Sequence, residues 1–224
     1  MGMNFDIARR NMVEQQVRTW EVLEPRVLEV LGTVPREDYV NPRYRKMAYA
    51  DTALPLEHGE TMMKPVVEGR LLQALNPQSG HSVLEIGTGS GYLTACLAQL
   101  AGRVMSVDCQ ADFIQSAQRR LAQAGGADVT IAHADAFDDE VMAGVLAGQT
   151  FDAVAVTGSA ATIPEAFRRW LKPAGRLFMV KGNEPAMEAC VITAIGEGQF
   201  AEESLFETDL GRLQGAEDRA KFVF

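Results

Sequence analysis

The chain has 224 residues with an ordinary globular composition, 47% hydrophobic and 23% charged, which excludes broad disorder. Its formal net charge of −9 disfavours nucleic acid as a partner, because phosphate binding requires clustered Lys and Arg. No apolar run approaches the ~18 residues of a membrane span, and the charged start lacks a secretory signal. The three scattered cysteines follow no zinc or redox spacing. We therefore expect a cytoplasmic, metal-free protein that is not membrane-bound.

The first 78 residues are predicted to form a largely helical N-terminal extension. Apolar side chains recur at helical spacing over residues 5–20, and a second helix is expected over 24–34, where Pro25 suits the first turn. Residues 34–60 are rich in proline, charge and aromatic side chains, which favours short helices, turns and extended chain. A helix from Pro65 to about Leu75 follows, with one apolar face.

From residue 82 onward, short apolar runs alternate with helical segments. The runs are SVLEI, RVMSV, DVTIAH, FDAVAV and GRLFMV, and the segments between them cover 91–101, 111–124, about 137–147 and 163–171. Short continuous apolar runs are typical of strands that are buried on both faces of a sheet. Their alternation with helices implies right-handed crossovers and a parallel sheet. After residue 183, the strand-like runs 188–198, 199–209 and 219–224 indicate an antiparallel end.

The expected fold class is therefore α/β and Rossmann-like, with a mostly parallel central sheet, helices on both faces and antiparallel C-terminal strands. We expect one structural unit, in which residues 1–78 form the helical extension or lid and an acceptor-site segment, and residues 79–224 form the α/β domain.

A glycine-rich loop follows the first predicted strand. Gly87, Gly89 and Gly91 stand between VLEI and the helix that starts at Tyr92, where the chain turns sharply and a ligand approaches the backbone. Asp108 ends the next predicted strand, the position expected for a partner of ribose hydroxyls. The pattern predicts a nucleotide-cofactor site.

Two classes of cofactor use this geometry. The dinucleotide pattern GxGxxG requires a small residue where this chain has Tyr92. The acids Glu85, Asp108 and Asp135 around the loop suit a cationic sulfonium and ammonium better than an anionic pyrophosphate. S-adenosylmethionine is therefore favoured over NAD.

Each acid has an expected role. Asp108 is expected to accept from the ribose hydroxyls and Asp135 from the adenine amino group, while Glu85 organises the loop or holds the methionine ammonium. The alternative for Glu85 is a solvated charge, and for Asp135 a turn or cap residue. The expected cofactor-binding residues are Glu85, Gly87, Thr88, Gly89, Ser90, Gly91, Asp108, Asp135, Ala136 and Thr157.

Segments along almost the whole chain resemble the protein-L-isoaspartate O-methyltransferase family. The more specific ones are VPREDYV (34–40), TALPL (52–56) and GETMMKP (59–65). Segments shared with many methyltransferases are VLEIGTGSGYLTACLA (83–98), FDAVAVTGSAATIP (151–164) and LKPAGRLFMVKG (171–182). The resemblance implies an S-adenosylmethionine-dependent enzyme of protein repair that methylates the abnormal carboxylate of isoaspartyl residues in damaged proteins.

One position departs from the family, whose pattern resembles G-x-T-I-S-x-P with the serine regarded as the active-site residue. Alignment on Gly59, Thr61 and Pro65 places Met63 at the serine position and Lys64 beside it. Methionine cannot donate a hydrogen bond to a carboxylate, so the residue-level role is not carried over. Thr61, Met63 and Lys64 remain the expected acceptor-site residues.

Lys64 has a hypothetical role, attraction of the acceptor carboxylate as a point charge; the alternative is a solvated lysine at a helix start. Two further functions stay open: a methyltransferase of the same ancestry that acts on a small carboxylate acceptor, and a cofactor-binding protein without catalysis. The sequence leaves a monomer or a dimer undecided.

Overall fold

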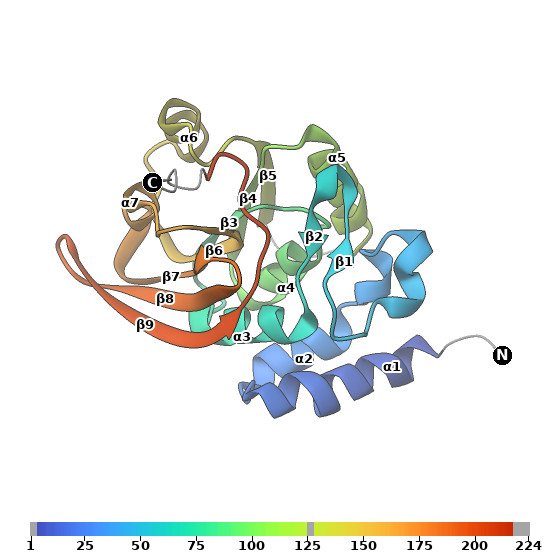
Figure 1. Ribbon diagram of the computed structural model, residues 1–224. Helices are drawn as coiled ribbons and strands as arrows, with labels where there is room; N and C mark the ends of the chain where they lie inside the picture. The colour runs from blue at the N-terminus through green and yellow to red at the C-terminus, as the bar shows by residue number, and fades with distance from the viewer. Residues whose placement is uncertain (1–3, 125–127, 217–224) are drawn as a thin grey trace, which may run out of the picture.

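A seven-stranded sheet forms the centre of the computed structural model, which describes residues 4–124 and 128–216 (Figure 1). The strand order is β5-β4-β3-β6-β7-β8-β9. The first five strands in chain order are parallel, and the last two pair antiparallel. Their bounds are β3 (Ser82–Ile86), β4 (Arg103–Asp108), β5 (Asp128–His133), β6 (Phe151–Ala160), β7 (Leu171–Asn183), β8 (Ala186–Gly196) and β9 (Gln199–Thr208).

These strands confirm the predicted α/β fold class, with the parallel sheet and its antiparallel end. The further strand-like run predicted over 219–224 lies outside the described residues.

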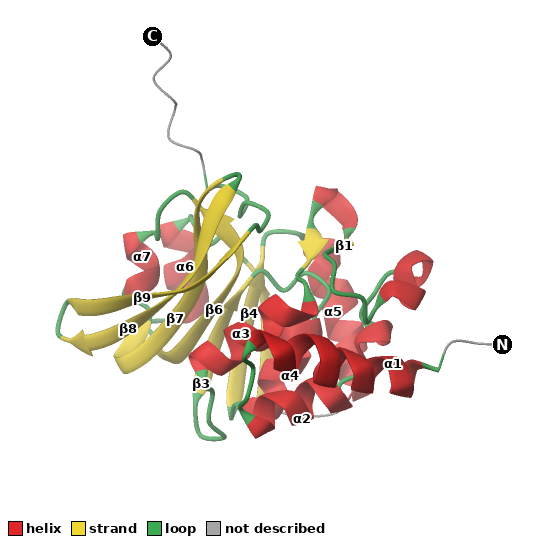
Figure 2. Cartoon of the chain, turned by 60° about the horizontal axis from the view of Figure 1, so that its bottom comes forward, coloured by secondary structure: helices red, strands yellow, loops and turns green. Residues whose placement is uncertain are grey.

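Helices cover both faces of the sheet (Figure 2). Because neighbouring side chains of a strand point to opposite faces, Val83 joins one hydrophobic cluster and Leu84 joins another. The first cluster includes residues of α2 (Pro25–Thr33), α3 (Pro65–Leu75) and α4 (Tyr92–Leu100), with α5 (Ala111–Ala124) packed against it. The second includes α6 (Asp139–Leu146) and Phe167 of α7 (Glu165–Arg168).

The N-terminal helices form where the sequence predicts them. α1 (Phe5–Asn11) continues through a π-helical turn (Met12–Val17) into a 3-10 turn (Arg18–Trp20), so residues 5–20 are helical. α2 (Pro25–Thr33) and α3 (Pro65–Leu75) each begin with proline, whose missing N–H costs nothing in a first turn.

The connection between α2 and α3 consists of short elements. Its 3-10 turns are Arg36–Asp38, Pro42–Met47 and Glu57–Gly59, and β1 (Leu54–Pro55) pairs antiparallel with β2 (Thr61–Met62). This hairpin places the segment 60–64 beside the sheet. Within the described ranges, no helix is long and apolar enough to cross a membrane.

Candidate functional site

A cavity lies at the carboxyl ends of the central strands, where open parallel sheets bind their ligands. Its lining includes Gly87 and Gly89 from the loop after β3, Asp108 from the end of β4, Thr157 from β6 and Thr61 from β2. Five residues that the sequence singled out, far apart along the chain, therefore meet at one cavity.

Position 87 requires glycine for two reasons, its backbone conformation and the closeness of the Thr157 side chain. Its φ is +93°, and a Cβ there would lie 2.2 Å from Oγ1 of Thr157. That hydroxyl donates to the carbonyl oxygens of Ile86 at 2.9 Å and Gly87 at 2.8 Å. Thr157 thus fixes the loop against β6, and the absence of a side chain at Gly87 keeps the strand–loop junction open.

Asp108 is held rigidly at the cavity wall. Its Oδ2 accepts from the backbone N–H of Gly89 at 2.9 Å, and its Oδ1 accepts from that of Gln110 at 2.8 Å. Burial raises the pKa of the Asp108 carboxyl, and these backbone donors oppose that rise. Each oxygen retains a further lone pair for a ligand hydroxyl.

Glu85 lies in the protein interior and does not line the cavity. Its Oε2 accepts from the hydroxyls of Thr94 at 2.5 Å and Ser106 at 2.6 Å, and Ser106 is also hydrogen-bonded to Thr88 of the loop at 2.6 Å. Burial raises the pKa of Glu85 to about 8. The carboxyl is therefore connected to the glycine loop from behind, through two hydroxyls.

The other expected cofactor residues do not line the cavity. Ser90 lines a neighbouring hollow, and Gly91 is the N-cap of α4. Ala136 is buried, whereas Asp135 is exposed and its Oδ1 accepts from the N–H of Phe137 at 2.9 Å. Asp135 therefore makes the turn contact that was its alternative role.

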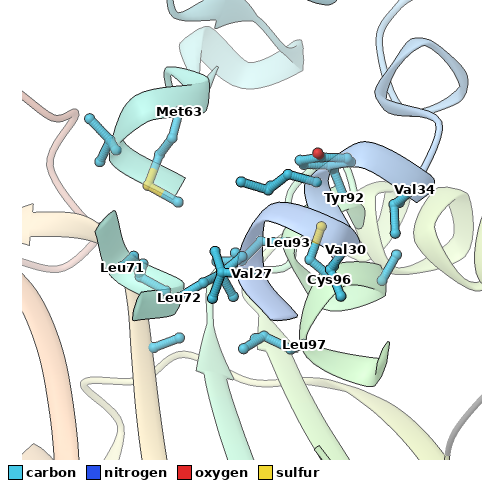
Figure 3. Packing of buried hydrophobic residues seen from close by; sticks show 14 of the residues in the cluster. Val27, Val30, Val34, Met63, Leu71, Leu72, Tyr92, Leu93, Cys96 and Leu97 are labelled. Atoms are coloured by element: carbon cyan, nitrogen blue, oxygen red, sulfur yellow. The ribbon is translucent and has the colours of Figure 1, made fainter. Parts of the chain in front are cut away.

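Met63 points into the hydrophobic core. Its side chain is 5% exposed and packs in the cluster that contains Leu71, Tyr92 and Leu93 (Figure 3). Its carbonyl oxygen accepts from Nη2 of Arg36 at 2.6 Å. Met63, which the resemblance aligned with the family's serine, is thus a core residue in this chain.

The buried guanidinium of Arg36 fixes the acceptor segment. It forms an ion pair with Glu68, both side chains being almost inaccessible to solvent, and it lies 4.7 Å from the ring centroid of Tyr92. Through its bond to the Met63 carbonyl, this cluster ties the segment to α3 and α4.

Lys64 faces a second hollow, a groove of about 500 Å³. Its Nζ lies 3.6 Å from Oδ1 of Asp209, and the groove is also lined by Trp20, Glu184 and Met187. The segment 61–64 separates this groove from the cofactor cavity, since Thr61 lines the cavity and Lys64 lines the groove.

Several lining residues are absent from the sequence-based expectation. Glu60 lies in the GETMMKP motif, and burial together with the charge of Asp108 raises the pKa of its carboxyl. Phe113 of α5 and the segment 210–214 after β9 also line the cavity. Glu60 stood in a recognised motif, whereas 210–214 follows the last regular strand and has no periodic signal.

The sequence matches a known family over most of its length. The family model described as protein-L-isoaspartate(D-aspartate) O-methyltransferase matches residues 8–207. A protein-L-isoaspartate O-methyltransferase of Rhodopseudomonas palustris is 35% identical over 207 residues, which cover 92% of this chain and 93% of that protein. The corresponding protein of Aeropyrum pernix is 34% identical, covering 96% of this chain and 84% of its own.

A solved structure from Plasmodium falciparum has the same fold. It is described as a protein-L-isoaspartate O-methyltransferase in complex with S-adenosyl-L-homocysteine, and it aligns with a TM-score of 0.77 at 21% identity. The alignment covers 95% of this chain and 99% of that one.

Proposed function

This chain belongs to the protein-L-isoaspartate(D-aspartate) O-methyltransferase family, and we propose from that premise that its two hollows divide the reaction between them. The chain is an S-adenosylmethionine-dependent methyltransferase of the protein-L-isoaspartate type. In our proposal the cavity beside Gly87 and Asp108 holds the cofactor, and the groove beside Lys64 receives the acceptor polypeptide. The observation that carries this assignment is the glycine loop, held against Thr157 with no room for a side chain.

The residues present fit S-adenosylmethionine. Asp108 and Glu60 both line the cavity, so a phosphate-bridged cofactor would meet two carboxylates. A sulfonium and an ammonium group carry the opposite charge and are attracted there. Tyr92, at the position where a dinucleotide site needs a small residue, is buried against Tyr39 at 5.6 Å between ring centroids.

In this assignment the protein positions the cofactor and the acceptor and supplies no acid–base chemistry. Asp108 accepts from ribose hydroxyls while Gly89 and Gln110 hold its orientation. Glu85, Ser106 and Thr88 support the loop from the interior. When bound, S-adenosylmethionine supplies an electrophilic methyl group, which a carboxylate with a pKa of about 4 accepts in its ionised form without a general base. Catalysis then depends on alignment.

The groove has the size and place for a polypeptide acceptor. It adjoins the cavity along two strips of chain, because Thr61 and Leu210 line the cavity while Lys64 and Asp209 line the groove. In our proposal the isoaspartyl side chain enters from the groove and approaches the cofactor cavity between these strips. A cytoplasmic location, which we also propose, is supported by the free thiols of Cys96, Cys109 and Cys190.

Methyl transfer from labelled S-adenosylmethionine tests the function. We expect a labelled methyl ester to form on an isoaspartyl peptide, measured as the volatile label that base releases. The same peptide with ordinary aspartate should carry no label. Labelling of small carboxylates but not of the peptide would favour the small-molecule acceptor. Cofactor binding without transfer to any carboxylate would favour a binding protein without catalysis.

A further inference from the structure

Glu60 brings a carboxylate to the wall of the cofactor cavity. The residue lies between the 3-10 turn Glu57–Gly59 and β2, it is half-buried, and it lines the cavity together with Asp108. Burial, and after it the negative charge of Asp108, raises the pKa of the Glu60 carboxyl. In the part of the chain that the structure describes, no hydrogen bond or ion pair reaches this carboxylate. A partly buried charge without a partner is unfavourable, and a bound cation relieves it.

The backbone of Glu60 is fixed against the glycine loop. The N–H of Leu56 donates to the carbonyl of Glu60 at 2.8 Å, and the N–H of Glu60 donates to the carbonyl of Glu57 at 3.1 Å. Leu56, across the hairpin, packs on the loop, since a Cβ added at Gly89 would lie 3.4 Å from its Cδ1. The hairpin therefore holds Glu60 beside the loop that we assign to the cofactor.

The other two acids expected near the loop are already engaged. Glu85, expected to organise the loop or to hold the methionine ammonium, lies in the interior, where the hydroxyls of Thr94 and Ser106 bind it. Asp108 is oriented by two backbone N–H groups and is assigned to the ribose hydroxyls. Among the described residues that line the cavity, Glu60 is thus the carboxylate that remains for a positively charged group.

The chemistry of S-adenosylmethionine decides which of its two positive groups suits Glu60. A carboxylate at the sulfonium would stabilise a charge that disappears during methyl transfer, and such ground-state stabilisation raises the barrier. It would also stand beside the methyl group as an acceptor itself, in an enzyme whose reaction is methyl transfer to carboxylates. The ammonium keeps its charge throughout the reaction and offers three N–H donors.

We propose that Glu60 binds the ammonium group of the methionine moiety of the cofactor, the role that the sequence suggested for Glu85. This inference rests on the proposed function, in which the cavity holds S-adenosylmethionine. The contact is a charge-assisted hydrogen bond between a carboxylate and an ammonium. Because S-adenosylhomocysteine has the same ammonium, Glu60 holds the methyl donor and its demethylated product alike.

Calorimetric titration with three ligands measures this contact without turnover: S-adenosylmethionine, S-adenosylhomocysteine, and an analogue of the latter in which hydrogen replaces the amino group. For Glu60→Gln we expect the Kd of the first two to rise equally, about ten- to hundred-fold, because a hydrogen bond between charged groups is lost. The Kd of the analogue should not rise. Glu60→Asp keeps the charge on a shorter side chain, so a smaller rise is expected. Glu57→Gln is the matched control, since Glu57 is an exposed glutamate of the same hairpin that lines the neighbouring hollow.

The outcomes separate this inference from the proposed function. Wild-type protein that binds the three ligands as expected but does not methylate isoaspartyl peptide refutes the function and leaves the role of Glu60 standing. Active wild type whose Glu60→Gln variant binds S-adenosylhomocysteine normally refutes only the role of Glu60.

Two further results would also overturn the assignment. An equal loss of affinity for S-adenosylhomocysteine and for the analogue would show that Glu60 supports the cavity without contacting the ammonium. A larger loss for S-adenosylmethionine than for S-adenosylhomocysteine, or a methyl ester on Glu60 in the mass spectrum of wild type incubated with S-adenosylmethionine, would place the carboxylate at the sulfonium. Retained binding of the analogue shows that a variant is folded, and Glu60→Asp carries the test if Glu60→Gln is not.

Discussion

Replacement of Met63 by serine introduces the residue that the resemblance implies at this position, yet we expect it to destabilise the protein rather than to improve its activity. The Met63 side chain is 5% exposed inside the cluster formed with Leu71 and Leu93. Truncation of a buried methionine to a small residue costs about 2–5 kcal/mol of unfolding free energy. The serine hydroxyl adds a buried polar group that needs a partner. For a chain of this size the loss corresponds to a fall in Tm of roughly 5–20 °C.

Urea denaturation and peptide kinetics together test this expectation. Met63→Ser is compared with Met47→Ser, because Met47 is 46% exposed and its truncation should cost less than about 0.5 kcal/mol. We expect the peptide KM of Met63→Ser to stay within about threefold of wild type at a temperature where both are folded. A stable Met63→Ser protein with a KM lowered tenfold would show that position 63 faces the acceptor and that our account of the core is wrong.

Three further substitutions probe the loop and its support. Gly87→Ala should abolish binding of S-adenosylhomocysteine in calorimetry, because its Cβ meets Thr157 at 2.2 Å and φ is +93°. Asp108→Asn should weaken that binding about ten- to hundred-fold, as expected when charged hydrogen bonds to ribose hydroxyls are lost. Glu85→Gln should flatten the dependence of unfolding free energy on pH. The folded-state pKa of Glu85 is about 8, above the ordinary 4.5, so the stability that protonated Glu85 contributes is complete below pH 4.5 and is lost by up to about 1.4 kcal/mol per pH unit as the pH rises to 8.

Each of these has a matched control in the same chain. Gly144→Ala introduces a Cβ with no heavy atom within 4 Å and should leave cofactor binding intact. Asp128→Asn changes an exposed aspartate at the far end of the sheet, and Glu197→Gln changes an exposed glutamate in the β8–β9 turn. Equal effects of a substitution and its control, or a Glu85→Gln protein that retains the full pH dependence, would contradict the corresponding assignment.

The sheet was predictable because its signal is local. Each parallel strand is a short apolar run buried on both faces, and each helix between them has its own periodicity. The loop at Gly87 and the acid at Asp108 were predictable for the same reason, since a strand–turn–helix motif fixes both positions within one unit. The structure brings them to one cavity with Thr157, which was also expected among the cofactor-binding residues.

The sequence did not determine whether a given side chain points to the ligand or to the protein interior. Glu85 follows the pleat of β3 to the interior, where Ser106 and Thr94 bind it, because period-two alternation gives it the same face as Val83. The motif around Met63 shows which residues are neighbours along the chain but not which of them faces the ligand. That depends on a tertiary contact, the bond from Arg36 to the Met63 carbonyl.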